Sequence, residues 1–578
     1  MNSTLYRLHM ISALCLSVFV MQGCLLLNRS TVTFSDTVPP QKAMLTHIIH
    51  MGQSLGAGEQ SLPIITDSAT GFGNLKFLIG THTWSNSNYP DRPELRKSDL
   101  FSFVPLTAQR RGGEGETIAN GMADHLSQTI KKDKFSNINF LFSYAGQGGR
   151  YLRELDKIHD DAKDPRSGVR QSKGGYYKTS IDDVIRAKKT ANGMGLPYSV
   201  FAISWMQGEA NGTLRINRWD SIRNREEALG IYKTDLINLK NDYQKDIKNI
   251  TGQLNSIPFF TYQTAGNFAG IAQLQACDQE KGMYMVGPTY MLPNAENSHF
   301  ENGNKVLHGD GIHLTADGER WLGEQFGKVM RKVIIEKKRW QPLRPVKSWY
   351  DPSKMTVIVK FHIPNPPLNL DTTWLPKQGN GFGFVVYDKA NKVYEIQKVL
   401  ILGSDMVSIS LVHPIAKGTE LFIKYAQASF VSEVSRRIID LRKSGKNNHG
   451  HENIEVVFPG DIQKEFTILN NEGVFYLSNR VVNDSAFTNL IVRKVNLDIK
   501  GNTVLTGEID ELRSNKNFMI GQSSFISRRF SFGNVRDSDN EKAVFSFKDT
   551  SYGDRVGQSY PLYNWCVAFF DFPISNGK

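Results

Sequence analysis

Short apolar runs alternate with longer helix-like segments between residues 44 and 338. Segment 225–243, for example, carries Leu229, Tyr232, Leu236 and Leu239 at helical spacing. Strands that alternate with helices predict an α/β domain, in which a parallel sheet is covered on both faces. The apolar runs that we interpret as its strands are 47–51, 138–142, 200–204, 257–261 and 283–286.

The pattern changes after a proline-marked junction at residues 339–345. Turn-prone segments such as 388–392 then separate β-type runs, and this spacing predicts a β-sandwich. The runs are 355–361, 382–387, 407–411 and 421–425. We assign residues 346–435 together with 517–578 to the sandwich.

A further β-rich stretch covers residues 436–516. It has turns of its own at 470–473 and 500–502. The pattern leaves two alternatives for this stretch, an insertion into the sandwich or a small third domain.

The first residues have the features of an export signal. A polar start with Arg7 leads into an apolar run that is too short to span a bilayer and that ends at Gly23 and Cys24. We interpret residues 1–24 as a signal peptide and residues 25–43 as a linker. A small residue before Cys24 also resembles a bacterial lipoprotein cleavage site. We therefore expect an exported protein, either secreted, periplasmic or an outer-membrane lipoprotein attached only through a lipidated Cys24. The alternative for Cys24 is an incidental cysteine.

Composition excludes several classes of function. The chain has 578 residues, 40% of them hydrophobic and 22% charged, which is typical of a globular protein with more than one core. The net charge of +12 comes from basic residues scattered among acidic ones, so no nucleic-acid partner is expected. Outside the signal region only Cys277 and Cys566 remain, too far apart in sequence for a disulfide framework or a zinc site.

A serine follows the first predicted strand, flanked by Gly52 and Gly56. Ser54 can thus sit on a tight turn with its hydroxyl exposed, and the glycines allow close approach of the backbone to a reacting carbonyl. An ordinary glycine-rich turn is the alternative. The same spacing occurs in the nucleophile elbow of α/β-hydrolases, but that elbow normally follows several strands, whereas Ser54 ends the first.

Asp310 and His313 lie three positions apart before a predicted helix that has Thr315 as N-cap. In a loop, this spacing allows the carboxylate to contact one imidazole nitrogen and leaves the other free to accept a serine proton. The alternatives are a simple loop hydrogen bond or, with less support, a metal site that lacks a third ligand at suitable spacing. The helix is indicated by Leu322, Phe326 and Val329 on one face.

Two further segments follow predicted strands. Segment 143–150 carries Gly148 and Gly149, whose backbone N–H groups are candidate donors, and segment 205–211 carries the amide of Gln207. Acyl transfer needs such preorganised donors for the negative oxygen of its tetrahedral intermediate. Both segments lie at the carboxyl ends of strands, where sites in parallel sheets assemble.

These four segments resemble the conserved blocks of the SGNH hydrolase superfamily, in particular its sialate O-acetylesterase-like branch. The string at 205–209, Trp-Met-Gln-Gly-Glu, is the most specific match. The resemblance covers about half the chain and implies a three-layer α/β/α sandwich with a five-stranded parallel sheet. It also implies that no metal or cofactor is required.

The resemblance implies a role for each candidate residue. Ser54 would be the nucleophile and His313 the base, with Asp310 orienting His313. The oxyanion hole would consist of the backbone N–H of Ser54, a glycine of the pair Gly148 and Gly149, and Gln207, with Glu209 and Arg150 as supporting residues. Arg150 replaces the threonine common in the family. It is a candidate contact for an acidic sugar, with a structural salt bridge as the alternative.

The C-terminal half is similar to β-domains attached to polysaccharide esterases of bacteria and phage tails, at residues 533–538 and 561–565. Trp349, Tyr425 and Trp565 are candidates either for stacking on sugars or for core packing. We therefore expect a serine esterase that removes O-acetyl groups from a carbohydrate such as sialic acid or a surface polysaccharide. The alternatives are a carbohydrate-binding or adhesin protein built on a hydrolase-like domain, and an esterase or lipase of other substrates.

Overall fold

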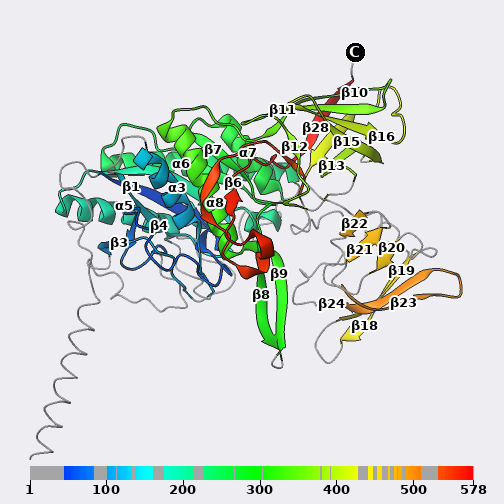
Figure 1. The fold of residues 1–578 in the computed structure, drawn as a ribbon, viewed down its shortest axis with the longest axis horizontal. Helices are drawn as coiled ribbons and strands as arrows, with labels where there is room; N and C mark the ends of the chain where they lie inside the picture. The colour runs from blue at the N-terminus through cyan, green and yellow to red at the C-terminus, as the bar shows by residue number, and fades with distance from the viewer. Residues whose placement is uncertain are drawn as a thin grey trace, which may run out of the picture.

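The fold is given by a computed structural model (Figure 1). It describes residues 44–83, 101–111, 113–132, 138–159, 175–213, 225–265, 267–301, 304–375, 377, 380–390, 392–426, 440–446, 452–458, 466–468, 474–477, 480–483, 490–509 and 532–576. The predicted signal peptide, the linker and the turn at 470–473 lie outside the described residues. Among the described helices, none combines the length and the apolar character needed to cross a membrane.

A seven-stranded sheet organises the first half of the chain, in the order β3-β2-β4-β1-β5-β6-β7. Its strands are β1 (Met44–Gly52), β2 (Leu75–Phe77), β3 (Phe103–Pro105), β4 (Ile138–Tyr144), β5 (Tyr198–Met206), β6 (Phe259–Gln263) and β7 (Met283–Pro288). All neighbours pair in parallel except β2 and β3. The five predicted runs are confirmed as β1, β4, β5, β6 and β7. The two additional strands are only three residues long, too short to leave a periodic pattern in the sequence.

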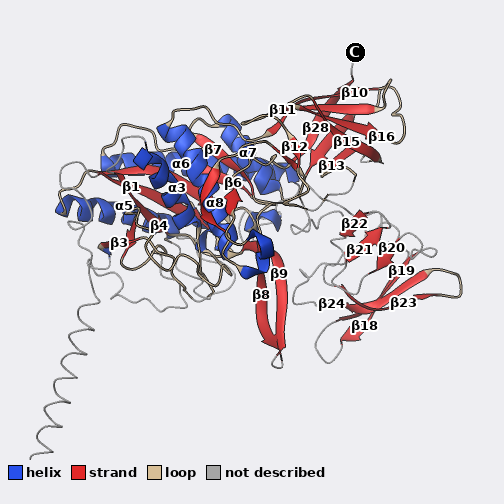
Figure 2. Ribbon diagram, viewed as in Figure 1, coloured by secondary structure: helices blue, strands red, loops and turns tan. Residues whose placement is uncertain are grey.

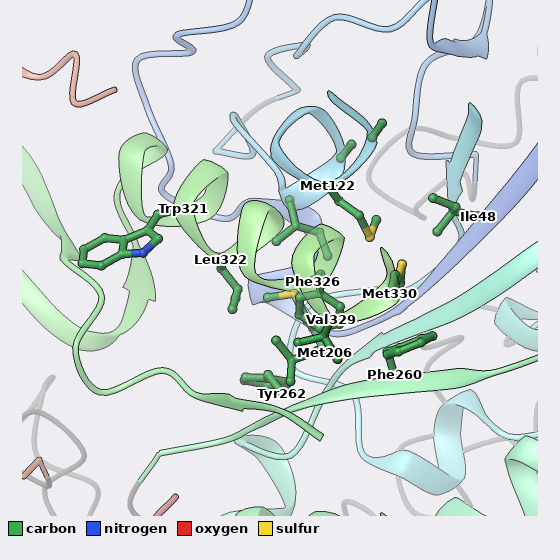
Figure 3. Packing of buried hydrophobic residues seen from close by; sticks show 14 of the residues in the cluster. Ile48, Met122, Met206, Phe260, Tyr262, Trp321, Leu322, Phe326, Val329 and Met330 are labelled. Atoms are coloured by element: carbon green, nitrogen blue, oxygen red, sulfur yellow. The ribbon is translucent and has the colours of Figure 1, made fainter. Parts of the chain in front are cut away.

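Helices cover both faces of this sheet. They are α2 (Ser54–Ala57), α3 (Ile118–Lys132), α4 (Leu152–Leu155), α5 (Tyr176–Gly193), α6 (Arg225–Thr251), α7 (Phe268–Gln279) and α8 (Ala316–Met330), with a 3-10 turn at Ala210–Thr213 and a π-helical turn at Arg331–Ile335. Successive residues of β1 enter different cores, because side chains alternate along a strand. Ile48 packs with the residues of α3 and α8, whereas Ile49 packs with those of α5, α6 and α7. Figure 3 shows the first of these cores, where Met122 and Phe326 lie near Ile48 and Met206. The α/β prediction is confirmed.

A two-stranded antiparallel hairpin precedes α8. Its strands β8 (Asn294–Glu301) and β9 (Asn304–Leu314) extend away from the sheet (Figure 1). Asp310 and His313 were expected in a loop, and that expectation is wrong, because both belong to β9. The hairpin is held by backbone pairing, and its sequence is rich in Asn, Glu, Gly and His. It therefore lacks the apolar alternation by which strands are recognised.

An eight-stranded sheet follows the junction, in the order β14-β13-β17-β28-β10-β11-β16-β15. One half pairs β17 with β28 and the other pairs β10 with β11. The halves join where β10 runs parallel to β28. Residues from both halves, such as Val359 and Ile423, belong to one core, so the sheet folds over on itself. The strands are β10 (Arg344–Asp351), β11 (Thr356–His362), β13 (Phe384–Asp388), β14 (Val393–Tyr394), β15 (Ile396–Leu402), β16 (Met406–Leu411), β17 (Leu421–Tyr425) and β28 (Phe569–Asn576).

The stretch between β17 and β28 forms sheets of its own. Figure 2 shows strands and no helix among its described residues up to 509. One sheet has four strands, in the order β18 (Asp440–Lys446), β19 (Glu452–Phe458), β24 (Thr503–Ile509) and β23 (Leu490–Leu497). The other has three, in the order β20 (Phe466–Ile468), β21 (Val474–Leu477) and β22 (Arg480–Asn483). The predicted turn at 500–502 is present, with Asp498 accepting hydrogen bonds from the N–H groups of Lys500 and Asn502. Because β17 and β28 pair with each other, these sheets interrupt the eight-stranded one along the chain.

Residues 537–565 are here called the C-terminal segment. We expected them in the β-sandwich, but they do not lie in the eight-stranded sheet. They pack on helix α8 of the α/β domain, where Glu324 accepts hydrogen bonds from the N–H groups of Val544 (2.9 Å) and Phe545 (2.7 Å). Trp321 donates to the Pro561 carbonyl at 2.8 Å. The contact partners are more than two hundred residues apart in sequence, so local pattern gives no sign of them. The short elements here are β12 (Asn369–Leu370) with β25 (Val535–Arg536), β26 (Lys542–Ser546) with β27 (Ser559–Pro561), and a 3-10 turn at Thr550–Arg555.

Helix α8 also carries a buried acid without a partner among the described residues. Glu319 is 0% exposed, and neither carboxyl oxygen has a hydrogen-bond partner there. Burial, and then the nearby Glu116 carboxyl, raise the pKa of Glu319 well above its usual range. The folded state therefore keeps a proton that the unfolded chain loses above the ordinary glutamate pKa of about 4.3, so this group lowers stability as pH rises from there.

Glu319→Met is accordingly expected to raise the free energy of unfolding by about 1–3 kcal/mol at pH 7.5, with a smaller gain at pH 4.5. Urea unfolding at the two pH values measures the difference. Glu395→Met, at an exposed position, is the matched control and should leave the pH dependence unchanged. A variant no more stable than the wild type at pH 7.5 would contradict the assignment.

Candidate active site

Ser54 is placed by the junction between β1 and β5. A Cβ atom at Gly52, which has a φ of 153°, would lie 2.1 Å from the carbonyl oxygen of Met206, so the residue before the turn must be glycine. The N–H of Gln53 donates to the same carbonyl at 2.8 Å. Ser54 then begins the short helix α2 and is 8% exposed. The predicted tight turn with a serine at the end of the first strand is confirmed.

The second glycine of the motif serves packing inside the protein. A Cβ atom at Gly56 would lie 2.6 Å from Nε2 of His50, so only glycine lets α2 lie on this imidazole. His50 is buried between the rings of Phe142 and Tyr144, and its Nδ1 lies 2.8 Å from the Ser204 hydroxyl. Both glycines thus allow close approaches between parts of the chain.

Burial keeps two histidines of β1 neutral. It lowers the pKa of both His47 and His50 to about 3, whereas an unfolded histidine titrates near 6.5. Between these values the unfolded chain binds more protons than the folded one. The stability that the two imidazoles contribute is therefore complete above pH of about 6.5 and is lost as pH falls toward 3.

His47→Gln is expected to reduce the loss of stability between pH 6 and pH 4 by about 1.4 kcal/mol per pH unit, the effect of one proton. Chemical denaturation at several pH values gives the slope. His413→Gln, at an exposed histidine, should leave the slope as it is in the wild type. Equal slopes in all three proteins would show that His47 does not titrate as expected.

Segment 143–150 brings Gly148 next to Ser54. A Cβ atom at Gly148 would lie 3.5 Å from Cβ of Ser54, an ordinary contact distance, so the backbone of this glycine lies directly beside the serine. The segment is fixed to the serine turn, because the Tyr144 hydroxyl donates to the Gln53 carbonyl at 2.8 Å and the Gln147 N–H donates to the Gly52 carbonyl at 3.1 Å. Gly148 is thus brought to the serine, as predicted, while its role as an oxyanion donor stays a prediction.

His82 and Glu114 brace the same segment. Nε2 of His82 lies 3.0 Å from the carbonyl oxygen of Gly146, and its Nδ1 lies 2.9 Å from Oε2 of Glu114. Burial lowers the pKa of His82, and its hydrogen bond to Glu114 opposes that shift. These residues were missed at the sequence level, because neither lies in a recognisable motif and 32 positions separate them.

Gln207 lies at the end of β5 and is fully buried. Its Nε2 faces three oxygens, Oδ1 of Asn211 at 2.7 Å, the Arg150 carbonyl at 3.0 Å and Oε1 of Gln53 at 3.3 Å. The Tyr232 hydroxyl donates to its Oε1 at 2.9 Å. The amide of Gln207 therefore connects the serine turn with segment 143–150. Its expected role as an oxyanion donor stays a prediction.

The two supporting residues have partners within the protein. Oε1 of Glu209 accepts hydrogen bonds from the hydroxyls of Tyr262, at 2.5 Å, and Thr264. Arg150 donates from Nε to the Tyr176 hydroxyl at 2.9 Å, and its Nη1 lies 3.5 Å from Oε1 of Glu154. The salt-bridge alternative for Arg150 is thus present in the structure.

His313 lies on strand β9, which contacts the helix that begins at Ser54. Strand β9 contacts helix α2, and the Ser61 hydroxyl donates to the Leu314 carbonyl at 2.8 Å. His313 is half-buried, with its Nε2 atom sealed from solvent. Thr315 is the N-cap of α8 and accepts from the Gly318 N–H at 3.0 Å, as predicted. The side chain of Asp310 lies outside the described part, so its orienting role stays a prediction.

The candidate stacking aromatics differ in burial. Tyr425 and Trp565 are 0% and 2% exposed and belong to cores, so sugar stacking is ruled out for them in this fold. Trp349 is half-buried on β10. Cys277 and Cys566 are both free thiols. In the part of the chain that the structure describes, no three His, Cys, Asp or Glu side chains are grouped to hold a metal ion.

Ser54, Gly148 and Gln207 follow β1, β4 and β5, which are neighbours in the parallel sheet. These residues therefore follow strands that end at one carboxyl edge, and β9, the strand that carries His313, contacts helix α2 at that edge. A hydroxyl, an imidazole and backbone N–H groups at one edge are the groups that acyl transfer to a serine requires.

Comparison with known proteins gives similarity in structure alone. No family model and no curated protein matches the chain. A carbohydrate acetylesterase from Xanthomonas citri is 13% identical, with 66% of this chain and 75% of that one covered and a TM-score of 0.39. NanS is 14% identical, with 52% of this chain and 99% of that one covered and a TM-score of 0.34. A carbohydrate acetylesterase from Sinorhizobium meliloti is 11% identical, with 50% of this chain and 99% of that one covered and a TM-score of 0.24. The proposal below accordingly rests on the residues of the chain itself.

Proposed function

We propose that the protein is a serine esterase of the SGNH type that removes short acyl groups, acetyl above all, from a carbohydrate. The observation that carries this is the position of Ser54, which follows β1 at the carboxyl edge, with Gly148 beside it and with the strand of His313 against its helix. The carbohydrate, sialic acid or a surface polysaccharide, is proposed from the resemblance of the sequence blocks.

In the first half of the proposed reaction, the Ser54 hydroxyl attacks the ester carbonyl while His313 accepts its proton. The carbonyl oxygen becomes an oxyanion, which backbone N–H groups of Ser54 and of the Gly148–Gly149 turn stabilise. Collapse of this intermediate breaks the ester bond, and the sugar hydroxyl leaves with the proton from His313. In the second half, His313 takes a proton from water as the oxygen of that water attacks the acyl-serine. Collapse of the second tetrahedral intermediate breaks the bond to Oγ of Ser54, which regains its proton from His313, and the carboxylic acid is released.

The first test is hydrolysis of p-nitrophenyl acetate, butyrate and octanoate by the full chain without residues 1–24. We expect the highest kcat/KM on acetate, followed by release of acetate from O-acetylated glycans. Preference for octanoate would instead favour an esterase or lipase of other substrates. If the protein hydrolyses neither the aryl esters nor the glycans, the proposal is overturned and a carbohydrate-binding protein is favoured.

The division of labour between His313 and Asp310 gives a second test. His313→Ala removes the proton acceptor, whereas Asp310→Asn removes only the group proposed to orient it. We therefore expect Asp310→Asn to retain more of kcat than His313→Ala, with both well below the wild type. Steady-state kinetics on p-nitrophenyl acetate give the comparison. Equal residual rates would contradict the orienting role of Asp310.

Export is proposed from residues 1–24. Expression of the complete chain in a bacterium, followed by fractionation and labelling with a radioactive fatty acid, tests it. We expect the protein outside the cytoplasm, with label that is lost in Cys24→Ala if this cysteine is lipidated. An unlabelled exported protein would indicate a cleaved signal with an incidental cysteine, and retention in the cytoplasm would contradict export.

A further inference from the structure

The guanidinium of Arg555 is held in one place on the C-terminal segment. Its Cζ lies 4.2 Å from the centre of the Trp374 ring, and its Nη2 donates to the Thr373 carbonyl at 2.5 Å. Trp374 in turn rests on the buried Phe547, with the ring centres 5.7 Å apart and the planes 20° from parallel. An arginine that is stacked and hydrogen-bonded in this way is ordered before any ligand binds.

This guanidinium has no acid to neutralise it. Among the described residues, no carboxylate forms an ion pair with Arg555, its exposed neighbour Asp554 included. Arg536 shows the contrast, because its guanidinium also lies over a ring, that of Tyr563, but pairs with Asp371 at 2.5 Å. Arg555 is only half-buried, and the N–H groups of its Nε and Nη1 have no acceptor in the described part of the chain. Such a group binds a carboxylate or a phosphate through two parallel N–H···O bonds.

The turn that carries Arg555 lies against the chain that follows His313. In this 3-10 turn, Thr550–Arg555, the hydroxyl of Tyr552 lies 2.8 Å from Oγ1 of Thr315, two residues after His313. Side chains three positions apart in a 3-10 helix lie above one another, so Arg555 projects on the same side as Tyr552, on the order of 6 Å farther along the turn. Figure 1 shows the turn, in red, at the base of the β8–β9 hairpin. The C-terminal segment therefore places a cation close to the strand that carries His313.

We propose that Arg555 binds an anionic group of the carbohydrate whose ester is presented to Ser54, so that the C-terminal segment supplies a subsite of the enzyme. This inference rests on the proposed serine esterase function and specifies its substrate class. Carboxylate and phosphate share the chemistry that a guanidinium recognises. The anionic group does not react, so its contact is equally strong in the ground state and the transition state. It therefore lowers KM and leaves kcat unchanged.

Release of acetate from three fully O-acetylated methyl glycosides tests the proposal. They are methyl glucuronide with a free carboxylate, the same sugar as its neutral carboxamide, and methyl glucoside 6-phosphate. Every hydroxyl is acetylated, so the position of the natural ester need not be known. We expect at least one anionic sugar to have a KM about 10- to 100-fold below that of the carboxamide, with an advantage that shrinks as salt is raised. The preferred anion distinguishes a carboxylate ligand from a phosphate.

Arg555→Met removes the charge and the donors but keeps an unbranched side chain on Trp374. The KM for the anionic sugars should rise to that for the carboxamide. Arg555→Lys, which keeps the charge without the planar fork, should fall between the two and serves if the methionine variant does not fold. Arg186→Met is the matched control, because Cζ of Arg186 lies 4.0 Å from the centre of the Phe101 ring on α5, which covers the opposite face of the sheet from α8. This variant should keep the preference for the anion.

The outcomes separate this inference from the function beneath it. An inactive wild type, or a Ser54→Ala variant that remains active on p-nitrophenyl acetate, would overturn the serine esterase proposal itself. Calorimetric titration of the three sugars without acetyl groups into wild type and Arg555→Met would then still show whether Arg555 binds the anion. A wild type that hydrolyses p-nitrophenyl acetate but releases acetate from none of the sugars, or from all of them alike, would overturn only the role of Arg555. So would an Arg555→Met variant that keeps the preference.

Discussion

Ser54→Ala is expected to lower kcat on p-nitrophenyl acetate by about 10⁴- to 10⁶-fold, because it removes the hydroxyl that we propose forms the acyl intermediate. The fold should be retained, since the hydroxyl of Ser54 makes no hydrogen bond to any described residue. Pre-steady-state kinetics check the result, with a burst of p-nitrophenol for the wild type and none for the variant. A fluorophosphonate should label the wild-type peptide that contains Ser54.

Ser353→Ala is the matched control for this experiment. Ser353 lies in the turn between β10 and β11, where its hydroxyl donates to Asp351 at 2.6 Å, far along the chain from the candidate site. Its replacement should leave both the burst and the labelling unchanged. Retention of more than a few per cent of activity by Ser54→Ala, after exclusion of contaminating esterases, would assign the nucleophile elsewhere.

Asp317→Ala is expected to produce the largest loss of stability, about 3–5 kcal/mol. The carboxylate of Asp317 accepts hydrogen bonds from the N–H groups of Lys548 and Asp549, and it lies 3.4 Å from Nη2 of Arg320. Both charged side chains are 1% exposed. The alanine would therefore remove the ion-pair partner of a buried guanidinium and leave two backbone N–H groups without acceptors.

Denaturation by guanidinium chloride measures this loss. Asp405→Ala is a suitable control, because Asp405 forms an ion pair with Lys360 at 3.4 Å between partly exposed side chains. Such a surface pair contributes at most about 1 kcal/mol. A loss for Asp317→Ala no larger than that of the control would show that the contact between α8 and the C-terminal segment contributes little to stability.

Much of the α/β domain was predictable from the sequence. The five strands that were predicted, β1, β4, β5, β6 and β7, are largely buried, so each one is a nearly continuous apolar run. Ser54 could be found for a related reason, because Gly52 is required where β1 and β5 approach each other and therefore marks the turn in the sequence. Thr315 could be recognised as a cap because a helix start depends on local chemistry alone.

Other features depend on the direction of side chains in space. The sequence does not show that the oxygen of Gln53 faces Ala210, and hence that its nitrogen faces away. His82 and Glu114 meet only because the chain folds back on itself. Strand β9 was not recognised because polar residues dominate it. In each case the determining contact joins residues that no local periodicity connects.

The contact between α8 and the C-terminal segment has a consequence for the order of synthesis. Helix α8 begins at Ala316, directly after the strand of His313, yet among the described residues its buried Lys328 has side-chain partners only beyond residue 538. Its buried Asp317 and Glu324 have further partners there as well. While a ribosome is still making the intervening sheets, the contacts of these three side chains are incomplete. The α/β domain is translated first but completed last, so a nascent or truncated chain would carry the candidate serine and histidine on an unfinished scaffold.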